Sequence, residues 1–176
     1  MTDALNTTTP KPVLVLAVGN PSRGDDALGP LLLEKLESGL SALDGIELLT
    51  DFQLQIEHAM DLQNRSIVLF VDASVAVEQA FSLEALSPQR DDSFTSHAMT
   101  PAAVLAVYQM VYHEPPPPSF LLSIRGETFE LGAALSALAV EHLEEAYQFI
   151  LLLLTEKNLA PFDRYPRSTL ASSLPK

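Results

Sequence analysis

Three continuous apolar runs recur along the chain. Residues 13–18 read VLVLAV, residues 66–74 read SIVLFVDAS and residues 119–124 read SFLLSI. A short apolar run that ends at a polar residue or glycine is typical of a strand buried on both faces of a parallel sheet. Two further strands are predicted at 46–50 and at 81–86, the second alternating between apolar and polar residues as an edge strand does.

The segments between these strands carry apolar residues at helical spacing. The pattern predicts helices over residues 27–40, 53–64, 101–112 and 135–156. Thr100-Pro101 is typical of a helix start, with threonine at the N-cap and proline at the first helical position. Because strands and helices alternate, we expect an α/β fold: a single domain with a mostly parallel, twisted five-stranded sheet and helices on both faces.

Length and composition limit the number of domains and the kinds of partner that the protein can have. A chain of 176 residues fits one domain, which we place at residues 13–156, between a flexible leader at 1–12 and a basic flexible tail at 157–176. The net charge of −13 argues against nucleic acid and anionic membranes as partners. The tail carries four basic residues and one acid, so residues 1–156 hold a charge of −16; an acidic body with a basic tail hints at a protein partner.

The absence of cysteine excludes disulfides, thiolate metal sites and a cysteine nucleophile. The N-terminus has no apolar segment typical of a signal peptide, and the apolar run near Phe149 is too short to span a bilayer. We therefore expect a soluble, cytoplasmic protein.

Polar residues follow each predicted strand. In open α/β sheets, ligands bind beyond the carboxyl ends of the strands, near a switch in strand order. This rule selects a set of residues from separate segments, with the histidine lying ahead of the helix at Thr100: Asp25, Asp26, Asp51, Asp72, His97, Arg125 and Glu127.

Each of these residues also has a purely structural interpretation. Asp25 or Asp26 would cap a helix by accepting backbone N–H bonds, and Asp72 would hold a turn. His97 would be an ordinary loop histidine, and Arg125 would neutralise nearby acids. The remaining histidines are interpreted as surface or helix-packing residues, with the last one solvated: His58, His113 and His142.

Taken together, Asp26, Asp72 and His97 favour a metal site. They come from three segments that should converge on one edge of the sheet. Two carboxylate oxygens and one imidazole nitrogen suit a divalent transition metal with open coordination positions.

Two alternatives stay open beside the metal site. The turn GNPSRG differs from the glycine patterns of phosphate-binding loops, and the acids behind it would repel a pyrophosphate. A serine hydrolase would use His97 with Ser96, Ser22 or Ser74, but the chain has no G-x-S-x-G elbow.

The motifs resemble those of the [NiFe]-hydrogenase maturation proteases. GNPSRGDDALGP, DFQLQIEHAMDL, VLFVDAS, SHAMTP and LLSIRGETFELG occur in that order in this family, over roughly residues 13–150. The resemblance implies an endopeptidase that removes a C-terminal extension from the precursor of the hydrogenase large subunit after nickel insertion. It also implies that Asp26, Asp72 and His97 bind that nickel, which the precursor supplies.

Three more residues, Asp25, Asp51 and Arg125, are expected to support the metal site without binding the metal. Asp25 is expected to cap the following helix and so to fix Asp26. Many family members have Asp-Gly-Gly-Thr after the second strand, whereas this chain has an acid without the glycines, Asp51-Phe52-Gln53-Leu54. Asp51 and Arg125 are placed beside the site without a defined role. A non-catalytic, nickel-sensing chaperone of the large subunit is the alternative function.

Overall fold

The computed structural model of the protein describes residues 9–39, 44–90 and 99–155. The predicted tail, most of the predicted leader and His97 lie outside the described residues.

The five strands form one sheet in the order β2-β1-β3-β5-β4. All neighbours are parallel except β4, which runs antiparallel to β5. The strand bounds agree with the prediction to within one residue, and the alternating segment is an edge strand as expected: β1 (Val13–Val18), β2 (Ile46–Asp51), β3 (Ile67–Ser74), β4 (Phe81–Ala85) and β5 (Ser119–Arg125).

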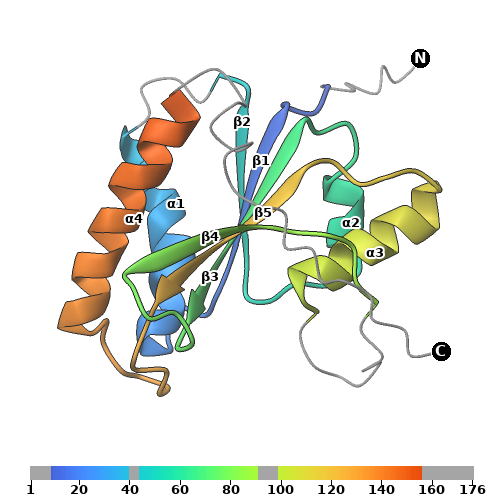
Figure 1. The fold of residues 1–176 in the computed structure, drawn as a ribbon. Helices are drawn as coiled ribbons and strands as arrows, with labels where there is room; N and C mark the ends of the chain where they lie inside the picture. Colours follow the sequence, from blue (N-terminus) through green and yellow to red (C-terminus); the bar gives the residue numbers. More distant parts are fainter. Residues whose placement is uncertain (1–8, 40–43, 91–98, 156–176) are drawn as a thin grey trace, which may run out of the picture.

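Helices cover both faces of the sheet (Figure 1). On one face lie α1 (Leu28–Gly39), which follows the 3-10 turn η1 (Gly24–Ala27), and the long α4 (Ala137–Thr155). On the other face lie α2 (His58–Asp61) and α3 (Pro101–Tyr112). Each pair of helices packs against its own apolar cluster, and the sheet separates the two clusters. The predicted α/β fold is confirmed.

The helix predicted over residues 53–64 is wrong in length, because only four residues of it are helical in α2. The Nδ1 atom of His58 accepts the N–H of Gln55 at 2.8 Å, which holds the start of the segment in a turn. At the other end Asn64 takes a left-handed conformation with φ of 61°. Leu54 and Leu62 are buried on either side of α2. The apolar spacing therefore reflects two separate residues that pack into the core, and not one face of a long helix.

The start of α3 is as predicted. The Oγ1 atom of Thr100 accepts the N–H of Ala103 at 3.2 Å, which is an N-cap, and Pro101 is the first helical residue. His113 ends the helix in a left-handed conformation with φ of 56°, and the four prolines that follow lead into β5. Among the residues that the structure describes, no helix combines the length and apolar character needed to cross a membrane.

Candidate metal and peptidase site

The sheet has its switch in strand order at β1. From β1 the chain passes through α1 to β2 on one side, and later through α2 to β3 on the other side. Connections that diverge in this way leave a crevice at the carboxyl ends of the strands. In the β1–β3 register Ala17 pairs with Val71, so Asp72 lies beside the last residue of β1. Asp26 follows eight residues after that last residue, in η1.

A tight turn holds Asp26. Its Oδ2 atom accepts the N–H of Asn20 at 2.8 Å. Gly19, with φ of 147°, passes so close that a Cβ atom there would lie 1.9 Å from the main-chain oxygen of Asp26. The Gly-Asn-Pro turn after β1 therefore requires glycine and fixes both the backbone and the carboxylate of Asp26.

Asp72 is near enough to Asp26 for the two charges to interact. Burial, together with the negative charge of Asp26, raises the pKa of Asp72 to about 6, although a hydrogen bond from the N–H of Ala73 acts in the opposite direction. Oδ1 of Asp26 and Oδ2 of Asp72 accept no hydrogen bond from the described residues. Carboxylate oxygens that accept no hydrogen bond in a partly buried crevice are suited to binding a cation.

Asp25 is completely buried, and its predicted role as the cap of the following helix is wrong. Its side chain crosses to the segment between β5 and α4. Oδ2 accepts hydrogen bonds from the N–H of Glu127 (2.7 Å), the N–H of Thr128 (3.0 Å) and the hydroxyl of Ser136 (2.8 Å). Oδ1 accepts the N–H of Ser136 at 2.7 Å, directly before α4. Burial alone would raise the pKa of Asp25, but these hydrogen bonds outweigh it and lower the pKa.

The segments around Asp25 interlock through two glycines. A Cβ atom on Gly24 would lie 2.4 Å from the oxygen of Thr128, and one on Gly126 would lie 2.8 Å from the Cβ of Asp25. The N–H of Asp25 also donates to the oxygen of Thr128 at 2.7 Å. The backbone that carries Asp26 is thus attached to a segment more than 100 residues away in sequence.

Asp51 pairs with a histidine that the sequence analysis did not connect to it. Its Oδ2 atom lies 3.4 Å from Nε2 of His58, which is buried. Because Nδ1 of His58 accepts the N–H of Gln55, Nε2 carries the proton and donates toward Asp51. The main-chain oxygen of Asp51 accepts the N–H of Gly19 at 3.1 Å. Asp51 therefore supports the turn that holds Asp26. In the sequence, the only sign of its pairing with His58 was that this histidine lies seven residues further along the chain.

Arg125 lies beside an acid, as the structural interpretation of this residue predicted. Its guanidinium donates to the main-chain oxygen of Glu78 at 2.7 Å and lies 3.7 Å from the carboxylate of Glu127. Its own main-chain oxygen lies 3.0 Å from Nδ1 of His142. The expectation that His142 is solvated is wrong, because this residue is buried between α4 and the end of β5.

The structure brings two of the three predicted ligands to one place. No group of three or more histidine, aspartate or glutamate residues that could hold a metal ion is found within 9–39, 44–90 and 99–155. His97 falls in the gap between the last two of these ranges, so the complete set of three ligands stays a prediction.

Comparison with known proteins identifies the fold. No protein-family model matches the chain, and no curated protein does either. The solved structure of the hydrogenase maturating endopeptidase HybD from E. coli matches with a TM-score of 0.65 and 25% identity, over 82% of this chain and 92% of that chain. The chain has the fold of the [NiFe]-hydrogenase maturation proteases. This confirms the resemblance seen in the sequence motifs.

Two archaeal structures match this maturation-protease fold at similar coverage. The [NiFe] hydrogenase maturation protease HycI from Thermococcus kodakarensis has a TM-score of 0.61 and 20% identity, over 82% of this chain and 93% of that chain. The hydrogenase 2 maturation peptidase from a Thaumarchaeota archaeon has a TM-score of 0.58 and 22% identity, over 82% and 98%. The match extends over nearly the whole length of each of these structures.

Proposed function

We propose that this protein is a metal-dependent endopeptidase that removes the C-terminal extension of a [NiFe]-hydrogenase large-subunit precursor after nickel insertion. The observation that carries the proposal is the pair of interacting carboxylates, Asp26 and Asp72, at the switch point of a maturation-protease fold. The solved structures that share this fold are named as hydrogenase maturation endopeptidases and proteases.

Nickel held in the precursor is the metal that this site would receive. Asp26 and Asp72 offer carboxylate oxygens, and His97, assigned from the sequence alone, would offer an imidazole nitrogen. This donor set suits a divalent transition metal, and without a thiolate it should hold such an ion weakly when no precursor is bound. The metal would polarise the scissile carbonyl or activate a water molecule.

The same arrangement would act as a checkpoint in the cytoplasm. The protein supplies only part of the coordination sphere, so the cleavage site is complete only when a nickel-loaded precursor docks. A precursor without nickel would leave the two carboxylates without a cation and would stay uncut.

Intact-mass analysis of the precursor tests the proposal. We expect the nickel-loaded precursor to lose its C-terminal peptide on incubation with the purified protein. Asp26→Asn and His97→Ala should abolish this, while Ser74→Ala should retain activity within about tenfold, or about 1.4 kcal/mol of transition-state stabilisation. A nickel-loaded precursor that binds but keeps its full mass would instead identify a nickel-sensing chaperone.

A further inference from the structure

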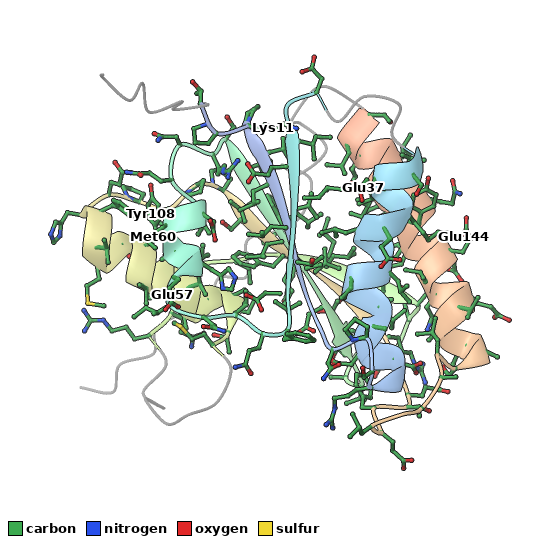
Figure 2. All side chains as sticks on the ribbon, turned by 180° about the vertical axis from the view of Figure 1, so that it is seen from behind. Lys11, Glu37, Glu57, Met60, Tyr108 and Glu144 are labelled. Carbon is green, nitrogen blue, oxygen red and sulfur yellow. The ribbon has the colours of Figure 1, made fainter. Side chains whose placement is uncertain are left out.

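A groove of about 590 Å³ lies between α1 and the edge strand β2. Figure 2 shows this side of the molecule, with Lys11 and Glu37 labelled at its upper end. The groove is lined by residues of β2, of α1 and of the turn after β1: Gly19, Pro21, Leu33, Glu34, Leu48 and Phe52 are among them.

The hydrogen bonds at the two ends of β2 fix which of its residues face the sheet. The N–H of Val13 donates to the oxygen of Gly45 at 3.0 Å, and the N–H of Gly19 donates to the oxygen of Asp51 at 3.1 Å. Along a parallel strand, the backbone groups of alternate residues point to opposite neighbours. The odd-numbered residues of β2 therefore bond to β1, and the even-numbered residues direct their N–H and C=O groups outward.

The outward groups form the edge of the sheet along the groove. The oxygen of Ile46 accepts a hydrogen bond from Nζ of Lys11 at 3.0 Å. The backbone groups of Leu48 and Thr50 make no hydrogen bond within the part of the chain that the structure describes. Together these two residues offer two N–H donors and two C=O acceptors at the edge of the sheet. An additional strand could form hydrogen bonds with them.

The walls of the groove determine which peptide it fits. Glu34 and Glu37 of α1 are exposed acids on one side. Leu48 is partly buried in the floor, and Phe52 is a 68% exposed aromatic side chain at the far end. An extended peptide with basic and apolar side chains would match both the charge and the apolar surface.

The groove leads to the candidate peptidase site. Its lining includes Gly19 and Asp51, which hydrogen-bond to each other. The next residue after Gly19 is Asn20, whose N–H binds the carboxylate of Asp26. A peptide that follows β2 in the groove would therefore reach the turn that carries Asp26.

We propose that this groove binds the C-terminal extension of the precursor as an added strand beside β2. The inference rests on the proposed function, because it assumes that the substrate has such an extension. A chain end is free to extend along an edge strand, whereas a folded body would not enter the groove. The six residues of β2 span roughly 20 Å, so about five or six residues of the extension fit, with basic side chains toward Glu34 and Glu37.

Model peptides test the strand pairing without the chemistry. The probe is a hexapeptide of alternating lysine and valine, acetylated and amidated at its ends, and the control probes replace lysine by glutamate or methylate alternate backbone nitrogens. We expect the lysine peptide to slow hydrogen exchange at the amides of Leu48 and Thr50, measured by NMR. We expect both control probes to bind at least about tenfold more weakly, or about 1.4 kcal/mol. The glutamate side chains would meet the acids of α1, and methylation would remove backbone N–H donors. Binding that leaves both amides unprotected would overturn the inference.

Matched variants test the same groove in the protein. Thr50→Pro removes an outward N–H at an edge position where proline is tolerated, and Thr50→Ala keeps that N–H. We expect the first to weaken the lysine peptide about tenfold and the second to leave it unchanged. Glu34→Lys with Glu37→Lys should weaken it as well, whereas the same change at the exposed acids Glu141 and Glu145 of α4 should not.

Processing of the nickel-loaded precursor separates this inference from the proposed function. If the wild-type protein cuts the precursor and folded Thr50→Pro cuts it at the same rate, the groove does not hold the extension although the function stands. If the wild-type protein does not cut it at all, the proposed function fails and the inference fails with it, whatever the peptides do. Slower cutting by Thr50→Pro and by the double lysine variant, with normal cutting by Thr50→Ala, is the expected result.

Discussion

Two adjacent aspartates have opposite environments in this protein. Asp25 is fully buried and saturated with hydrogen bonds, whereas Asp26 is partly exposed at the crevice and its carboxylate accepts one hydrogen bond from the described residues. Hydrogen bonds to a carboxylate favour its charged form. The first environment is suited to holding structure together and the second to binding a cation.

We expect Asp25→Asn to destabilise the protein strongly. Both oxygens of Asp25 accept backbone N–H groups, from Glu127, Thr128 and Ser136, so either orientation of an asparagine amide would point a donor at a donor. The free energy of unfolding should fall by about 3 kcal/mol, the scale for lost hydrogen bonds to a charged group. Urea denaturation measures this, and Asp26→Asn is the matched control. Equal stability of the two variants would contradict the assignment.

We expect Asp72→Asn to stabilise the free protein above pH 6 while abolishing processing. The pKa of Asp72 is raised from 3.8 to about 6. The ionised form is therefore unfavourable in the folded state: the cost is absent below about pH 4, grows up to about pH 6 and is complete above it. The difference corresponds to roughly 3 kcal/mol, which solvent reduces to about 1–2 kcal/mol for this partly exposed group.

Calorimetry from pH 4 to pH 8 checks this expectation. The melting temperature of Asp72→Asn should exceed that of the wild type at pH 7 and converge with it at pH 4. Asparagine can still accept the N–H of Ala73, so the turn after Asp72 is kept. A variant that is less stable than the wild type at pH 7 would show that Asp72 carries a structural role instead.

At the level of elements, the strands were predictable and the short helix was not. A strand buried on both faces leaves a continuous apolar run, so β1 and β3 could be bounded from sequence to within one residue. The segment with α2 has apolar residues at helical spacing, but Ile56 and Met60 are exposed and the segment turns instead. The hydrogen bond from the Gln55 N–H to His58 holds the residues before α2 in a turn. The spacing of apolar residues gives no sign of this bond.

We expect Gly29→Ala to be destabilising although alanine favours helices by about 1 kcal/mol over glycine. A Cβ atom on Gly29 in α1 would lie 2.6 Å from the oxygen of Val18 and 3.2 Å from the oxygen of Val71. The helix would have to move away from the ends of β1 and β3, where the candidate site lies. Unfolding should become easier by about 2 kcal/mol, and processing should slow.

The exposed residue Ser38 of the same helix supplies the control. Ser38→Ala should change the free energy of unfolding by less than about 0.5 kcal/mol. If Gly29→Ala were as stable as Ser38→Ala, the close packing of α1 on the two strand ends would not be required.

At the level of the whole molecule, the topology explains which parts of the site were visible in the sequence. The rule that ligands bind beyond the strand ends selected Asp26 and Asp72, and the strand order places both near the switch point. The partners of Asp25 could not be found in this way, because Glu127 and Ser136 lie 102 and 111 residues further along the chain. Only the folded chain shows that the first and last βα connections are joined through this buried carboxylate.

The proposed division of the metal site between this protein and the precursor leads to a prediction for the complex as a whole. Treating the purified protein with a chelator and removing the chelator by gel filtration should leave its processing activity unchanged, because under the proposed function the nickel arrives with the precursor. A precursor produced without nickel should stay at full mass, even when the protein has been incubated with nickel and desalted beforehand. Asp26 and Asp72 alone bind a divalent ion too weakly to retain it through that step.

Metal analysis and intact-mass measurement of the same samples test whether the nickel comes from the precursor or from the protein. We expect well under one equivalent of nickel on the desalted protein and full cleavage only of the nickel-loaded precursor. Full cleavage of nickel-free precursor by chelator-treated protein would contradict the checkpoint and favour chemistry that needs no metal. Loss of activity on chelation, restored by adding nickel to the protein alone, would instead show that the protein keeps a metal of its own. In that case His97 and the two carboxylates would have to bind far more tightly than three such ligands are expected to.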